Sequence, residues 1–158
     1  MAQKSTHITS LNNLGQSVWY DNLSRDVLES GELASLIESG VSGLTSNPTI
    51  FKQAIADTTN YDDAMRAPER ATLDTESLCE ELMIQDVAAA ADLLRPIYET
   101  TNALDGYASI EVSPELSADE AGTVEAAQRL WNKLARPNIM IKIPATLECI
   151  PAIQKVLE

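Results

Sequence analysis

The amino-acid sequence predicts an α/β fold built on parallel strands, with about four β/α units in a single domain over residues 1–158. Two observations lead to this prediction. Short apolar runs alternate along the chain with longer amphipathic segments, as they do where helices connect the strands of a parallel sheet. The chain has 158 residues, of which 44% are hydrophobic, which is enough for one substantial core and too few for two ordinary domains.

The strands are predicted from short runs rich in apolar and β-branched residues. They are Ser17–Leu23, Ser42–Asn47, Tyr107–Ser113 and Ile139–Ala145. Each run contains at least one polar side chain. We expect the four strands to be neighbours in one parallel sheet.

The helices follow from capping residues and from apolar spacings of three and four. Ser24 can cap a helix between the first two strands, and Gly40 suits its end. Pro48 can begin a second helix that continues to about Ile55, before a polar loop around Asp57–Asp63. The remaining predicted helices are Thr75–Thr100, Asp119–Ala135 and a last one containing Ile150, Ile153, Val156 and Leu157.

Charge and composition exclude several function classes. Eleven basic and 24 acidic residues give a net charge of −13, which disfavours binding to nucleic acid and to anionic membranes. A local site could still bind one small phosphorylated metabolite. No run is apolar enough to cross a bilayer, and the N-terminal residues lack the pattern of a secretory signal, so we expect a cytoplasmic protein.

Cysteine and histidine are too few for a metal site. Cys79 and Cys149 have no CxxC partner, so we expect buried free thiols rather than a disulfide framework or a zinc site. His7 is the only histidine, which leaves no second imidazole for a His-based metal site or proton relay. The sequence therefore predicts no metal.

Polar side chains interrupt strands that should be buried on both faces, so each needs a partner or a role. Alternation along the last strand puts its isoleucines on one face and Lys142 on the other, which we expect to be the interior one. The same alternation turns Asp21, Thr45 and Glu111 to the interior face, and Asn47 continues the face of Thr45. These groups should meet at the carboxyl-terminal edge of the sheet, where barrel active sites lie.

Such a group of side chains suits Schiff-base chemistry. Burial lowers the pKa of a lysine, and only the neutral amine can attack a ketone to form a carbinolamine and then a Schiff base. Lys142 is the predicted nucleophile. Dehydration and carbon–carbon cleavage both need proton transfers, for which Asp21 and Glu111 are the candidates.

Each of these residues also has a structural interpretation. Lys142 could extend its ammonium group into solvent from an exposed strand, and Glu111 could be its ion-pair partner. Asp21 could cap the helix that follows the first strand, and Asn47, before Pro48, could be a turn residue.

Four segments resemble the transaldolase family. They are VWYDNLSRD (Val18–Asp26), GLTSNPTIF (Gly43–Phe51), YASIEVSPELSAD (Tyr107–Asp119) and NIMIKIPAT (Asn138–Thr146). They are similar, in this order, to the family's first three strands and to the segment with its Schiff-base lysine. The resemblance covers nearly the whole chain, and its three longer motifs are specific in combination.

The resemblance implies a TIM (β/α)8 barrel that needs no metal or organic cofactor. Such an enzyme transfers a dihydroxyacetone unit from sedoheptulose 7-phosphate or fructose 6-phosphate to an aldose phosphate, in the non-oxidative pentose phosphate pathway. Lys142 would form the Schiff base, and Asp21 would be the acid/base at the C4 hydroxyl. Glu111 would assist Schiff-base formation through water, Asn47 would hydrogen-bond the dihydroxyacetone part, and Thr45 would line the pocket.

A family barrel of roughly 250 residues contains four further β/α units, which supply the arginines that bind the substrate phosphate. We therefore expect a half or incomplete barrel that either pairs with a second copy of itself or belongs with a missing C-terminal half. Three alternatives stay open: a non-catalytic half-barrel or assembly partner, an aldolase that releases free dihydroxyacetone, and an unrelated doubly wound binding module in which Lys142 and Glu111 are an ion pair.

Overall fold

The computed structural model describes residues 7–158, with the side chains at positions 50 and 57 left out of the description. Residues 1–6 lie outside the described part. The prediction that the N-terminal segment is not a secretory signal falls partly on these residues. Within residues 7–158, no helix is both long enough and apolar enough to span a bilayer.

The centre of the molecule is one four-stranded sheet in which all neighbouring strands are parallel. Its strands lie side by side in chain order: β1 (Trp19–Tyr20), β2 (Gly43–Thr45), β3 (Tyr107–Glu111) and β4 (Ile139–Lys142). All four predicted strands are confirmed, although each is shorter than predicted. The prediction of an α/β fold with four parallel β/α units is also confirmed.

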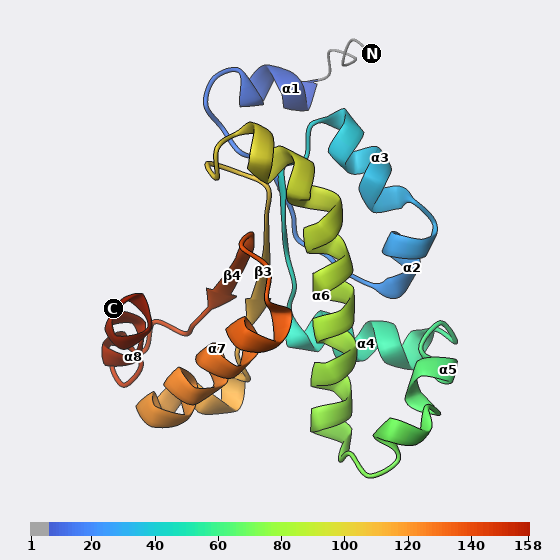
Figure 1. The fold of residues 1–158 in the computed structure, drawn as a ribbon, viewed down its shortest axis with the longest axis vertical. Coiled ribbons are helices and arrows are strands. Elements are labelled where there is room, and N and C mark those ends of the chain that lie inside the picture. Colours follow the sequence, from blue (N-terminus) through green and yellow to red (C-terminus); the bar gives the residue numbers. More distant parts are fainter. Residues whose placement is uncertain (1–6) are drawn as a thin grey trace.

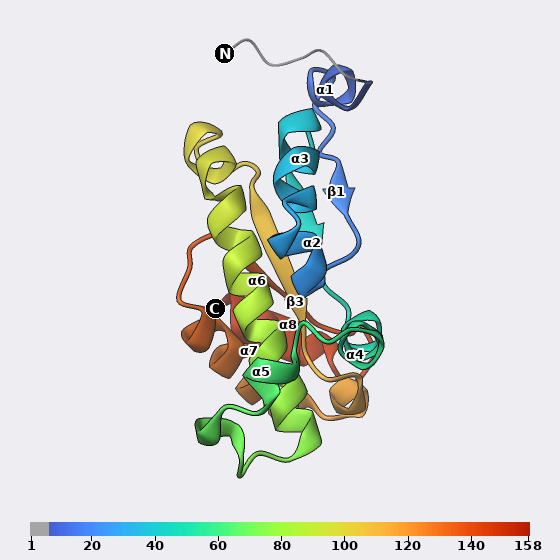
Figure 2. The ribbon, with the colours of Figure 1, turned by 90° about the vertical axis from the view of Figure 1, so that its right-hand side faces the viewer.

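Helices connect successive strands and lie mainly on one side of the sheet, with the long α6 running along β3 (Figures 1 and 2). They are α1 (His7–Asn12), α2 (Arg25–Glu29), α3 (Glu32–Ser39), α4 (Pro48–Asp57), α5 (Asp62–Met65), α6 (Thr75–Thr100), α7 (Glu120–Leu134) and α8 (Ile150–Leu157), together with the short 3-10 helices η1 (Pro68–Arg70) and η2 (Pro114–Ala118).

The connection between β1 and β2 differs from the single helix that the sequence predicts. Ser24 caps as expected, its hydroxyl accepting from the Val27 N–H at 3.3 Å, but α2 ends at Glu29. Gly31 then takes a left-handed conformation, with φ of 79°, and α3 begins after it. α3 ends at Gly40, as predicted, with φ of 115°. A glycine at a positive φ interrupts helical geometry without steric cost, which explains the break.

The other helices agree better with the sequence. α4 begins at Pro48, as predicted, and α6 has the predicted bounds. α7 is one residue shorter at each end than predicted, because Asp119 is its N-cap and Ala135 its left-handed C-cap. The short helices α1 and α5 were not predicted, since neither has enough turns to give an apolar period.

The two faces of the sheet have opposite surroundings. Leu44, Ala108 and Ile110 are fully buried against the helices. On the other face, the ring of Trp19 covers Gly43 so closely that an added Cβ would lie 2.2 Å from its Cε2 atom. Met140, on that same face at the β4 end of the sheet, is 42% exposed. The predicted alternation is confirmed, but among the described residues the face predicted to be interior is open to solvent at its β4 end.

Asp74 gives a pH-dependent test of the long helix α6. Its carboxylate accepts the Ser77 backbone N–H at 2.8 Å, and this bond lowers the pKa of Asp74 below its usual 3.8. A lowered pKa stabilises the fold above the usual value, and that stabilisation is lost as the pH falls through the folded-state pKa. We expect wild type to be more stable than Asp74→Asn near pH 7, with a difference that shrinks as the pH falls below 3.8 and disappears once it is below the folded-state pKa.

Thermal unfolding of the two proteins between pH 7 and strongly acidic pH measures this difference. Asp74→Ala serves as the control, because it removes the cap oxygen as well as the charge and should be destabilising throughout the range. A wild-type advantage over Asp74→Asn that does not change with pH would contradict the assignment.

Candidate active site

The register of the strands groups the predicted site residues in two layers on the open face. Thr45 pairs with Ser109, which in turn pairs with Met140. Asp21 is level with Thr45, because the residues before them, Tyr20 and Leu44, are paired. One layer therefore contains Asp21 and Thr45. Glu111 and Lys142 are partners in the next layer toward the carboxyl-terminal ends. Aligned side chains on neighbouring parallel strands are close enough to interact directly.

Lys142 and Glu111 form an ion pair at this edge. The Lys142 Nζ donates to the Glu111 Oε2 at 3.2 Å. The Glu111 side chain is 17% exposed, whereas that of Lys142 is 52% exposed. The structure thus brings the predicted nucleophile and a predicted proton-transfer group together. The burial expected for Lys142 is wrong for this chain, because nothing among residues 7–158 covers the open face above it.

Asp21 and Thr45 form the second contact. The Thr45 hydroxyl donates a hydrogen bond to the Asp21 Oδ1 across the β1–β2 pair. Ser24, rather than Asp21, caps α2, so the capping interpretation of Asp21 is wrong. The hydroxyl of Thr45 orients the Asp21 carboxylate on the open face of the sheet.

Asn47 has a local structural role. It is the N-cap of α4, and its side-chain Oδ1 accepts from the Thr49 N–H at 2.8 Å. Capping of α4, rather than a turn, therefore accounts for its side-chain oxygen. The cap does not use the amide nitrogen, which is the group that could donate to a substrate oxygen.

The cysteines and the acidic residues form no metal centre in the described residues. Among residues 7–158, no group of three or more His, Cys, Asp or Glu side chains could hold a metal ion. Both cysteines are free; Cys149 is buried, as predicted, whereas Cys79 is only partly buried. The Cys149 thiol lies 3.5 Å from the Thr123 hydroxyl, at the start of α8.

Sequence reasoning missed a buried polar cluster of Arg25, Tyr61 and Asp86. The Arg25 guanidinium pairs with Asp86 at 2.8 Å, and the Tyr61 hydroxyl donates to the other Asp86 oxygen at 2.9 Å. A signal was present, because Asp86 stands on the apolar stripe of α6 between Met83 and Val87, where a charge needs a partner. Its partners come from distant segments that periodicity does not identify.

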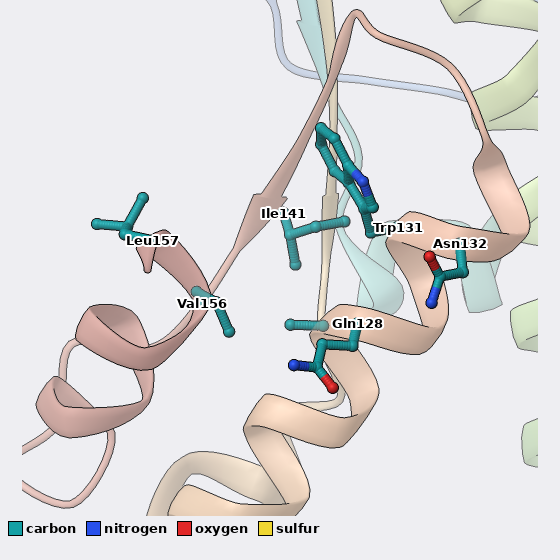
Figure 3. Close-up of a pocket in the computed structure, with 7 residues that line it drawn as sticks. Gln128, Trp131, Asn132, Ile141, Val156 and Leu157 are labelled. Carbon is teal, nitrogen blue, oxygen red and sulfur yellow. The ribbon is translucent and has the colours of Figure 1, made fainter.

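A groove of about 540 Å³ lies on the outside of the sheet, away from the predicted site (Figure 3). Ile141 of β4 is at its floor, Gln128 and Trp131 of α7 form one wall, and Val156 and Leu157 of α8 form the other. Lys142, Glu111 and Asp21 are not among its lining residues. The chemistry-bearing residues and this apolar groove are thus separate features.

A family model described as Transaldolase/Fructose-6-phosphate aldolase matches residues 18–158. The matched part includes all four strands and every predicted site residue.

Curated relatives give the same result. The chain is 46% identical over 152 residues to a protein named Transaldolase 2 of Nostoc sp. (strain PCC 7120), and 47% identical over 145 residues to the Transaldolase of Thiobacillus denitrificans. It is 44% identical over 151 residues to the Transaldolase of Thermobifida fusca. The alignments cover 96%, 91% and 95% of this chain, and 40%, 40% and 41% of the relatives. The chain thus spans about 40% of the length of these relatives.

Glu111→Gln tests whether the Lys142–Glu111 pair is kept for stability. Because Lys142 is more than half exposed, solvent screens the pair, and we expect the free energy of unfolding to fall by less than about 1 kcal/mol. Chemical denaturation of both proteins measures the change. Arg129→Gln, which breaks a half-exposed pair with Glu80 on the helical side, is the matched control. A loss of several kcal/mol for Glu111→Gln alone would favour the structural interpretation.

Proposed function

Because the chain belongs to the transaldolase/fructose-6-phosphate aldolase family, we propose that it carries the Schiff-base site of a transaldolase. The enzyme would transfer a dihydroxyacetone unit from sedoheptulose 7-phosphate or fructose 6-phosphate to an aldose phosphate. The pathway is the non-oxidative pentose phosphate pathway, and the expected cytoplasmic location is part of this proposal. The observation that carries it is the Lys142–Glu111 pair at the carboxyl-terminal edge, on the same face as Asp21.

In the proposed reaction, the neutral Lys142 amine attacks the C2 carbonyl of the ketose phosphate, and a carbon–nitrogen bond forms. Loss of water from the carbinolamine gives a protonated Schiff base. Glu111, next to the amine, assists the proton transfers of these steps through water. Solvent access to the Lys142 side chain is compatible with a water that acts there.

Carbon–carbon cleavage then needs a base at the C4 hydroxyl. Asp21 removes that proton, the C3–C4 bond breaks, and its electron pair moves toward the iminium nitrogen to give an enamine. The aldose phosphate leaves as the aldehyde. Addition of the enamine to an acceptor aldehyde reverses these steps, with Asp21 returning the proton. The hydrogen bond from Thr45 supports this role by orienting the carboxylate, and the Asn47 amide would hold the dihydroxyacetone part.

Borohydride trapping tests the proposed nucleophile. The protein is incubated with fructose 6-phosphate, reduced with borohydride, and examined by intact-mass analysis. We expect a dihydroxyacetone-sized adduct on wild type and on Lys155→Ala, and none on Lys142→Ala. Lys155 is a suitable control because it is also an exposed lysine paired with a glutamate, at 2.6 Å from Glu120.

The outcomes separate the alternatives. An adduct that persists in Lys142→Ala would overturn the assignment of the nucleophile. No adduct on folded wild type would favour the non-catalytic half-barrel. Release of free dihydroxyacetone without an acceptor would favour an aldolase over a transferase.

We also propose that the open face is completed by a second copy of the chain. β1 and β4 are the end strands of the described sheet, and Met140 on its open face and Trp131 beside β4 are well exposed. Pairing β4 of each copy with β1 of the other would give eight strands and cover both edges. Further β/α units on the same chain, as the longer relatives would have, are the alternative.

The net charge of −13 opposes this pairing, and salt screens it. We therefore expect light scattering to show a two-chain species that increases with salt concentration. Met140→Lys should reduce it, whereas Leu104→Lys, at an exposed position after α6, should not. A monodisperse monomer at high salt would show that two copies do not pair.

A further inference from the structure

Arg25, Tyr61 and Asp86 form a closed ring of hydrogen bonds beneath the connection from β1 to α2. The Arg25 Nε and Nη2 donate to the Asp86 Oδ1 at 3.1 and 2.8 Å. The Tyr61 hydroxyl donates to the Asp86 Oδ2 at 2.9 Å and accepts the Arg25 backbone N–H at 2.7 Å. Tyr61 thus joins the first residue of α2 to the middle of α6.

The ring is buried and its polar groups are matched. Asp86 is 2% exposed, Tyr61 is fully buried, and the guanidinium of Arg25 lies 4.7 Å from the centre of the Tyr61 ring. Burial raises the pKa of Asp86 and of Tyr61, although Arg25 acts against both shifts. A buried charge is costly unless it is paired, and even a paired one often stabilises a fold no more than apolar residues of the same size would. Core stability is therefore a weak explanation for this ring.

The hydrogen-bonded cluster of Arg25, Tyr61 and Asp86 contacts two connections that carry proposed site residues, the one from β1 to α2 and the one from β2 to α4. Arg25 begins α2 four residues after Asp21. The Tyr61 ring also packs edge-on against Phe51 of α4, with centroids 5.5 Å apart, and α4 begins after Asn47. Tyr61 thus contacts both connections. These contacts hold the start of α2 and helix α4 at fixed positions relative to the sheet.

We propose that Tyr61 and Asp86 are positioning residues, which hold the β1–α2 connection so that the Asp21 carboxylate stays aligned with Thr45 on the open face. The inference rests on the proposed role of Asp21. It predicts that loss of the Tyr61 hydroxyl loosens the connection selectively, while the ion pair of Lys142 and Glu111, on β4 and β3, keeps its geometry.

Tyr61→Phe is the test, because it keeps the ring contacts with Arg25 and Phe51 and removes only the hydroxyl. Tyr107→Phe is the matched control: it removes one hydrogen bond, to the Ala103 carbonyl at 2.8 Å, at the other end of the sheet. Amide hydrogen exchange over residues 21–25 should become about tenfold faster in Tyr61→Phe and stay unchanged in Tyr107→Phe. The carboxyl carbon signal of Asp21 in NMR should shift in Tyr61→Phe alone.

Borohydride trapping of added free dihydroxyacetone on Lys142 should be equal in wild type and in Tyr61→Phe, because Schiff-base formation with this ketone needs no carbon–carbon cleavage and so does not use Asp21. Where wild type cleaves fructose 6-phosphate, the variant should lose most of kcat with little change in KM.

Exchange at residues 21–25 that matches wild type, or that rises together with exchange throughout the chain, would overturn the positioning role. Absence of trapping in wild type counts against the proposed function only, and the exchange and NMR results still decide the role of Tyr61.

Discussion

The parallel register of the four strands is the constraint on which the rest of this structure depends. Pairing Glu111 with Lys142 also fixes the pairing of Ala108 with Ile139, so the register that brings two charges together is the one that buries the apolar face. A shift of β4 by one residue against β3 would turn every side chain of β4 to the opposite face, exposing Ile139 and burying Lys142 against the helices. The hydrophobic effect on the helical side therefore sets the geometry of the polar side.

Helices on one face and an open opposite face explain why the proposed site is assembled but not enclosed. Lys142 has its carboxylate neighbour, and Asp21 has its hydroxyl donor, because both contacts join adjacent strands. Enclosure needs atoms above Lys142 that the described residues do not supply. A half-exposed lysine is thus the expected result of a correct register without a closed barrel.

The sequence predicts the features that arise from local periodicity, and it misses those that depend on distant segments. The bounds of α6 are predictable because its apolar positions recur over seven turns and Asp74 precedes it as a cap. The break at Gly31 is less visible, since apolar residues stand on both sides of the glycine and its positive φ leaves no mark in the spacing of apolar residues. Strand alternation correctly turns Lys142, Glu111 and Asp21 to one face, but it cannot report solvent access. The ring of Arg25, Tyr61 and Asp86 joins three segments whose contact only tertiary packing creates.

A structural role explains some of the polar strand residues better than others. Asn47 is explained at least in part by its cap, since helix α4 needs an acceptor for its first N–H groups. Asp21 has no such duty, because Ser24 already caps α2, and the Asp21 carboxylate accepts a hydrogen bond from the Thr45 hydroxyl. Lys142 and Glu111 gain little from an ion pair that water screens. This small structural contribution favours the chemical role proposed for the pair.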